Sequence, residues 1–231
     1  MNRQLQDVLA LFHQHKINYW LDSGTLLGLM REGELLESDK DLDISVWDTE
    51  LEKLQKILPC FHQAGYQVYA AYYQGQVFKY NLTPANLRKL RTVDINIYRK
   101  AVDYAWCPMY YFKFSASTKK KDTQSKRSFA KKVRALIRSA WKKLNTKIAL
   151  NVHIDRLPWR PFLVLGTWWI PAEFYRQRQF DPDIQAWRPL RWEDYLAYRY
   201  GNWQQPQINW VFYRDDHGIK AKIPVDLIGL D

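Results

Sequence analysis

Three aspartates in two separate stretches of this sequence have the spacing of a metal site. Asp41 and Asp43 lie one residue apart in a run that alternates polar and apolar side chains, as a strand does. Residues i and i+2 of a strand point to the same face, so the two carboxylates project together and repel one another unless a cation lies between them. Asp94 occupies a polar position in a second alternating run, residues 91–98. We therefore expect the three carboxylates to hold Mg²⁺, or Mn²⁺ in its place.

A metal bound in this way would serve the transfer of a phosphorylated group. Mg²⁺ commonly takes one or two carboxylates together with phosphate oxygens. Gly24 and Thr25, in a turn at a predicted helix start, would offer backbone N–H groups and a hydroxyl to a phosphate. Asp94 could also orient or deprotonate an attacking hydroxyl. An isolated Asp-x-Asp pair is common on solvated surfaces, so the prediction rests on the order of turn, first strand and second strand.

The elements that would position these residues follow from hydrophobic periodicity. Leu5, Val8, Leu9 and Phe12 recur at helical spacing, whereas both acidic runs alternate with the period of a strand. Helices are predicted around residues 5–12, 26–30, 51–58 (after a capping box at 49–52) and 192–200, and strands at 19–21, 41–46, 66–72, 76–82 and 91–98. The pattern predicts an α+β (or α/β) fold, with helices flanking a mixed sheet that carries the acids on one edge.

The composition of the 231-residue chain bounds its class. Apolar residues make up 47% of it, enough for a folded core and too many for a disordered chain. Cys60 and Cys107 lie far apart, so we expect neither a disulfide scaffold nor a structural zinc site. The sequence has neither a signal-peptide core at its N-terminus nor an apolar run of about 18 residues. We expect a cytoplasmic protein.

The net charge of +11 is concentrated in one segment. Between Lys113 and Lys147 there are 13 basic residues and one acid, so the rest of the chain is close to neutral. Apolar residues at helical spacing there, such as Phe129 and Leu136, predict a basic amphipathic helix. Residues 119–147 could contact an anionic membrane surface, pack on the domain as an ordinary surface helix, or bind nucleic acid. We favour the membrane surface, which would make the protein peripheral on the inner face, and expect no nucleic-acid partner.

Several stretches closely resemble the LicD/fukutin family. They are YWLDSGTLLG at residues 19–28, REG at 31–33, DKDLDI at 39–44 and, near the C-terminus, YL at 195–196, YGNW at 200–203 and Pro206. The resemblance covers residues 1–100 well and residues 166–206 loosely, and the basic segment has no counterpart in it. We accordingly divide the chain into a nucleotidyltransferase-like core (1–112), a basic insertion (113–150) and an aromatic-rich part (151–231) that completes the same domain.

The resemblance implies a nucleotidyltransferase-like fold and a transfer reaction on a glycan. Members of the family move phosphocholine, ribitol phosphate or similar groups from a CDP-activated donor to a sugar hydroxyl, and their acceptors are often built on lipid carriers. The match implies metal ligation by Asp41, Asp43 and Asp94, with Gly24 and Thr25 in a phosphate-facing turn. We therefore expect a phosphotransferase with a CDP-linked donor and a cell-surface glycan acceptor, either free or lipid-linked.

Three further residues each have two interpretations. Asp22 either binds substrate or is an ordinary turn residue. Arg31 either pairs with a phosphate, which the resemblance favours, or caps a helix C-terminus. Asp39 either supports the metal-binding acids or is merely exposed, and we count it with the substrate-binding residues. The family usually has Pro-Trp where this chain has Glu37 and Ser38, so the identity of the substrates is not carried over.

Two rival functions stay open at this point. One is a nucleotidyltransferase that uses an NTP on a small molecule or RNA, and the other is a non-catalytic binding protein on the same fold. Lys79, in a predicted strand, reaches a donor in one interpretation and, more commonly for such a lysine, faces solvent in the other.

Overall fold

The computed structural model describes residues 2–86, 90–112, 149–154, 163–208 and 210–221 of the chain. The predicted basic helix and its membrane contact, residues 119–147, lie outside these described residues. Among the residues that are described, no helix has the length and apolar character needed to cross a membrane.

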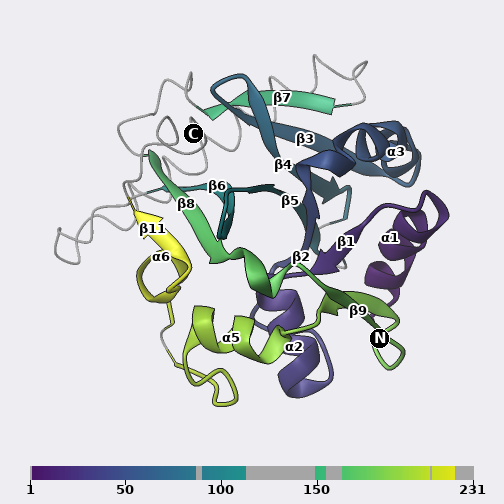
Figure 1. The fold of residues 1–231 in the computed structure, drawn as a ribbon. Coiled ribbons are helices and arrows are strands. Elements are labelled where there is room, and N and C mark those ends of the chain that lie inside the picture. Colours follow the sequence, from purple (N-terminus) through teal and green to yellow (C-terminus); the bar gives the residue numbers. More distant parts are fainter. Residues whose placement is uncertain (1, 87–89, 113–148, 155–162, 209, 222–231) are drawn as a thin grey trace, which may run out of the picture.

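A large mixed sheet forms the centre of the fold, and helices flank it (Figure 1). Within the described chain it has nine strands in the order β11-β8-β6-β5-β4-β3-β7, with β2 paired to β5 and β1 paired to β2. The strands are β1 (Tyr19–Leu21), β2 (Asp41–Trp47), β3 (Tyr66–Tyr73), β4 (Gln76–Pro84), β5 (Thr92–Lys100), β6 (Tyr104–Phe112), β7 (Ala149–His153), β8 (Leu163–Pro171) and β11 (Ile219–Ala221). Strands β9 (Arg178–Asp181) and β10 (Ala186–Pro189) form a separate two-stranded sheet.

The helices are α1 (Arg3–Gln14), α2 (Ser23–Glu32), α3 (Leu51–Gln63), α5 (Trp192–Tyr200) and α6 (Phe212–Asp215), with 3₁₀ turns η1 (Asp48–Glu50) and η4 (Ala172–Phe174). Four of the helices, α1, α2, α3 and α5, bury apolar side chains in the main core, and the short α6 buries none. Helices α1 and α3 meet through the rings of Phe12 and Phe61, while α2 and α5 lie together elsewhere on the molecule (Figure 1). The main core joins side chains from all four of these helices to the strands beneath them.

The register of three neighbouring strands places the acids on one face of the sheet. Strand β2 runs parallel to β5 with Asp43 opposite Asp94, and β4 runs antiparallel to β5 with Asn81 opposite Asp94. The alternating residues Ile44 and Ile95 are opposite one another and fully buried in the core. The period of two therefore separates a polar face, which carries the acids, from an apolar face that stabilises the fold.

The sheet divides at the end of β5. Strand β5 pairs with β2 from Thr92 to Tyr98 and with β4 from Val93 to Asn96, but it pairs with β6 only at Arg99 and Lys100. Strand β6 then pairs with β8 from Tyr104 to Phe112. Strands β4 and β5 thus form one wall, and β6 and β8 form another, on two sides of the cavity described below.

The predicted α+β mixed sheet with flanking helices is confirmed, and the predicted helices and strands are confirmed in type, most of them longer than expected. The expected position of the acids on one edge of the sheet is wrong, because β2 pairs with β1 and β5, and β5 pairs with β2, β4 and β6. Gly33 ends α2 in the left-handed conformation (φ 73°), as its position suggested. The predicted turn at residues 23–25 is the first turn of α2. The predicted capping box at 49–52 is wrong, because η1 precedes α3 and no side chain caps that helix. The Glu50 carboxylate accepts from the Asn18 backbone N–H (3.1 Å) and from the Asn18 side-chain amide (2.9 Å).

Candidate active site

Helix α2 brings its first turn against the start of β2. Asp22 caps the helix by accepting from the next backbone N–H at 2.8 Å, and its own N–H donates to the Asp43 carbonyl at 3.2 Å. The Thr25 hydroxyl accepts from the Asp43 N–H at 2.7 Å. Gly24 consequently lies so close to Asp39 that a Cβ at position 24 would collide with that carboxylate. Glycine lets the helix approach the Asp39 carboxylate without that side chain having to shift.

Asp39, Asp41 and Asp43 form the aspartate cluster of the site. Each offers a carboxylate oxygen, and these oxygens all lie within 4.8 Å of one another. Asp94 adjoins the cluster as the neighbour of Asp43 on β5, but it is not one of these three. Metal ligation was predicted for Asp41, Asp43 and Asp94. The structure instead brings Asp39 into the closest group and leaves Asp94 beside it.

Proximity and burial shift the acidity of this cluster. Burial is the largest cause for Asp41, and a hydrogen bond with Asp39 and its charge add to it, so the pKa of Asp41 rises to about 6. Burial, followed by the charges of Asp41 and Asp94, raises the pKa of Asp43 well above the ordinary range of a carboxyl. A divalent cation would relieve this repulsion.

Lys79 and Asn81 on β4 hold Asp94. The Lys79 ammonium forms an ion pair with the Asp94 carboxylate, and the Asn81 amide donates a hydrogen bond to the other oxygen of the same group. Burial, the largest single cause, lowers the pKa of Lys79, but the charges of Asp94, Tyr110 and Asp43 and the hydrogen bond to Asp94 together outweigh it and raise the pKa. The side chain of Lys79 is only 19% exposed. Lys79 therefore does not face open solvent, although that was the commoner interpretation for a lysine in a strand.

A cavity of about 800 Å³ opens in front of these residues. The aspartate cluster, Gly24 and Asp94 line one part of it, together with Lys79 and Arg31. Aromatic side chains line another part; they are Phe78, Tyr110, Trp168, Tyr200, Trp203, Trp210 and Phe212. The space therefore combines an acidic, metal-suited corner with cations and broad apolar surfaces, as small-molecule sites commonly do.

The structure separates the other predicted site residues into two groups. Gly24, Arg31 and Asp39 line the cavity, and the Arg31 guanidinium also bonds Glu32 and, at 3.4 Å, the carbonyl of Trp203. Asp22 and Thr25 are buried and do not line it. Their side chains hold the first turn of α2 in place, as the bonds above show.

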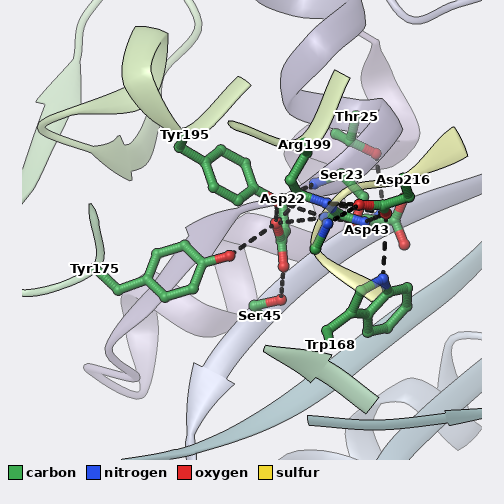
Figure 2. A network of polar contacts seen from close by, with 11 residues as sticks. Asp22, Ser23, Thr25, Asp43, Ser45, Trp168, Tyr175, Tyr195, Arg199 and Asp216 are labelled. Carbon is green, nitrogen blue, oxygen red and sulfur yellow. Dashed lines mark hydrogen bonds and ion pairs between the residues drawn. The ribbon is translucent and has the colours of Figure 1, made fainter. Parts of the chain in front are cut away.

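A buried polar network adjoins the cavity, which its members Ser23 and Arg199 also line, and it was not predicted (Figure 2). Arg199 of α5 pairs with Asp216 and donates to the Ser23 hydroxyl at 2.7 Å and the Tyr195 hydroxyl at 2.5 Å. Tyr195 in turn donates to Asp22. The network ties α5 and the segment before β11 to the first turn of α2. The YL match at 195–196 pointed to this region, but no local pattern revealed a buried arginine.

Comparison with known proteins places this site in a recognised domain. The family model described as LicD/FKTN/FKRP, nucleotidyltransferase domain, matches residues 16–136. That range contains the first turn of α2, the aspartate cluster, Lys79 and Asp94.

Two uncharacterized rickettsial proteins match a shorter stretch. One, from Rickettsia prowazekii (strain Madrid E), is 42% identical over 64 residues, which are 28% of this chain and 24% of that protein. The other, from Rickettsia typhi (strain ATCC VR-144 / Wilmington), is 39% identical over 64 residues, which are 28% of this chain and 21% of that protein. The matched region thus spans about a quarter or less of each relative.

A solved structure also has limited similarity. The crystal structure of ANT(2″)-Ia in complex with adenylyl-2″-tobramycin is 14% identical, with a TM-score of 0.33 over 43% of this chain and 50% of that one.

Proposed function

Because the chain belongs to the LicD/FKTN/FKRP family, through a nucleotidyltransferase domain that covers residues 16–136, we propose that it is a metal-dependent phosphotransferase. It would move a phosphorylated group, such as phosphocholine or ribitol phosphate, from a CDP-activated donor to a hydroxyl of a glycan. The observation that carries this proposal is the convergence of the aspartate cluster and Gly24 on one wall of the cavity.

The residues present fit a hard divalent cation. The cluster offers three carboxylates, and none of the described residues that line the cavity is a histidine or cysteine. Oxygen-only donor sets suit Mg²⁺ or Mn²⁺ rather than softer metals. Asp41 and Asp43 would hold the ion, with Asp39 as a third carboxylate. When bound, the ion would supply positive charge that stabilises a phosphoryl group and its nucleotide leaving group.

The chain's own groups would bind and orient the reactants. The N-terminal turn of α2 exposes Gly24 to the cavity, and the positive end of the helix dipole favours a phosphate there. Arg31 provides a charged fork for a second phosphate oxygen. Asp94 would orient or deprotonate the acceptor hydroxyl. The tryptophans opposite, Trp203 and Trp210, offer flat apolar surfaces on which a sugar ring or base would pack.

Product analysis tests the reaction class. Purified protein is incubated with Mg²⁺ or Mn²⁺ and CDP-choline, CDP-ribitol or CDP-glycerol, and thermal stabilisation identifies the donor that binds. With that donor and a glycan acceptor, we expect CMP as the released nucleotide. Pyrophosphate released from an NTP would instead favour nucleotidyl transfer. If no donor raised the melting temperature with either metal, the phosphotransferase proposal would be abandoned.

Stabilisation by Mn²⁺ is expected to increase as the pH rises through about 6. The raised pKa of Asp41, about 6, means that the folded protein binds a proton there more readily than the unfolded chain does. The metal-free protein therefore loses stability between about pH 4 and pH 6, as this carboxyl ionises in an acidic environment. Below that range a proton competes with the metal, and above it the metal relieves the repulsion. Melting temperatures with and without Mn²⁺ across this range measure both effects.

Asp41→Asn supplies the matched comparison for the pH dependence. Without a titrating group at position 41, the melting temperature of the metal-free protein should fall less steeply over the same range. Asp103→Asn, at an exposed aspartate outside the cavity, should retain the wild-type slope. Parallel curves for the wild type and Asp41→Asn would contradict the assignment.

A further inference from the structure

Lys79, near the middle of β4, brings a positive charge against the acids. Its ammonium pairs with Asp94, which also accepts a hydrogen bond from Asn81. The strand register explains this arrangement, since Asn81 is opposite Asp94 and Lys79 is opposite Asn96, the next residue on that face. Lys79 and Asn81 thus hold Asp94 beside the aspartate cluster, of which Asp94 is not a member.

The charges around Lys79 are unbalanced. The aspartate cluster and Asp94 supply four carboxylates, whereas the other cations of the cavity wall are bound elsewhere: Arg31 pairs with Glu32 and Arg199 with Asp216. Lys79 is the cation of the described cavity wall that contacts this acidic group. A single ammonium offsets only part of that negative charge, so the site retains a strong attraction for a further cation.

We propose that Lys79 is an exchangeable counter-ion, which neutralises Asp94 in the metal-free site and turns to the anionic donor once a divalent metal binds. The inference rests on the proposed function of the site. A divalent ion on the cluster would repel the nearby ammonium and attract the Asp94 carboxylate, so both sides of the ion pair change partners together. The lysine side chain suits this exchange because its compact charge sits on a flexible four-carbon stem that already lines the cavity.

Mn²⁺ affinity tests the first half of the exchange. Titration calorimetry on Lys79→Gln should show Mn²⁺ binding tighter by about tenfold or more than in the wild type, because no ammonium opposes the ion at close range. The same variant should melt at a lower temperature without metal, since Asp94 loses its partner. Lys79→Arg, which keeps the charge, should remain within about threefold of the wild-type affinity.

Arg31→Gln is the matched control, because it removes another cavity-wall cation that pairs with Glu32 rather than with the acids of the site. Its Mn²⁺ affinity should stay near that of the wild type. An equal gain in Arg31→Gln and Lys79→Gln would overturn the inference, because it would reflect the general field of the cavity. Unchanged or weaker Mn²⁺ binding by folded Lys79→Gln would overturn it as well.

Two measurements complete the test. In wild-type protein labelled with ¹⁵N-lysine, the Lys79 Nζ resonance should shift on addition of Mg²⁺. The resonance is assigned by its loss in Lys79→Arg. An unmoved resonance refutes the exchange even if Lys79→Gln fails to fold.

CDP affinity tests the second half of the exchange. With Mn²⁺ present, CDP should bind Lys79→Gln at least about tenfold more weakly than the wild type, and equal CDP affinity refutes this half. Wild-type protein that binds no Mn²⁺ at all would instead defeat the proposed function, and this inference with it.

Discussion

Replacing Asp43 with asparagine is expected to raise the melting temperature of the metal-free protein and to remove its response to Mn²⁺. Asp43 is surrounded by Asp39, Asp41 and Asp94, and burial together with these charges raises its pKa well above the ordinary range. Asparagine keeps the shape of the side chain and removes the repulsion, which should stabilise the protein by roughly 1 kcal/mol, or a few degrees. Loss of the metal should reduce group transfer by at least about a hundredfold.

A paired aspartate elsewhere is the control for this prediction. Asp181 accepts from Arg188 at 2.7 Å and two backbone N–H groups, and these hydrogen bonds, outweighing the opposite effect of burial, lower its pKa. Asp181→Asn should therefore lower the melting temperature and leave the Mn²⁺ response intact. If Asp43→Asn were the less stable protein and still responded to Mn²⁺, Asp43 would be a structural residue rather than a ligand.

The sequence was sufficient to predict those parts of the site that depend on local periodicity. Alternation around Asp43 and Asp94 indicated two strands with their acids on one face, and the structure pairs these two positions. Asp39 was predicted as a substrate-binding residue rather than as a member of the carboxylate cluster, because it precedes β2 and follows no period. Its place in the cluster depends on the approach of Gly24, a contact between elements that spacing along the chain does not reveal.

The second wall of the cavity depends on pairing between distant segments. Strand β6 contains Pro108, which argues against a central strand when only the sequence is read, yet it pairs there with Thr167 of β8. Strand β8 is separated from β6 by the basic segment, so neither strand had a recognisable local partner. Strand β6 pairs with β5 only at Arg99 and Lys100, so most of its pairing is with the distant β8.

Replacing Arg199 with methionine is expected to destabilise the protein by about 3–5 kcal/mol, because it leaves a buried carboxylate without its cationic partner. Arg199 is 2% exposed and Asp216 is 4% exposed, and the guanidinium pairs with that carboxylate through more than one nitrogen. Arg191→Met is the control, since this exposed arginine pairs only with Glu173 and Asp194 among the ion pairs of the described chain. It should cost less than about 1 kcal/mol. Urea unfolding measures both free energies.

A double-mutant cycle distinguishes the buried pair from the packing of a large side chain. If the pair is the cause, Arg199→Met combined with Asp216→Asn should be less destabilised than the sum of the two single variants by at least about 1 kcal/mol. Additive losses would instead attribute the effect to the rings of Trp168 and Tyr200, over which the guanidinium lies at 5.3 and 5.5 Å.

Because Arg199 also donates to Ser23 at the start of α2, folded Arg199 variants should bind Mn²⁺ more weakly, although Arg199 contacts none of the clustered aspartates. Wild-type Mn²⁺ affinity in such a variant would show that α2 keeps its position without the network.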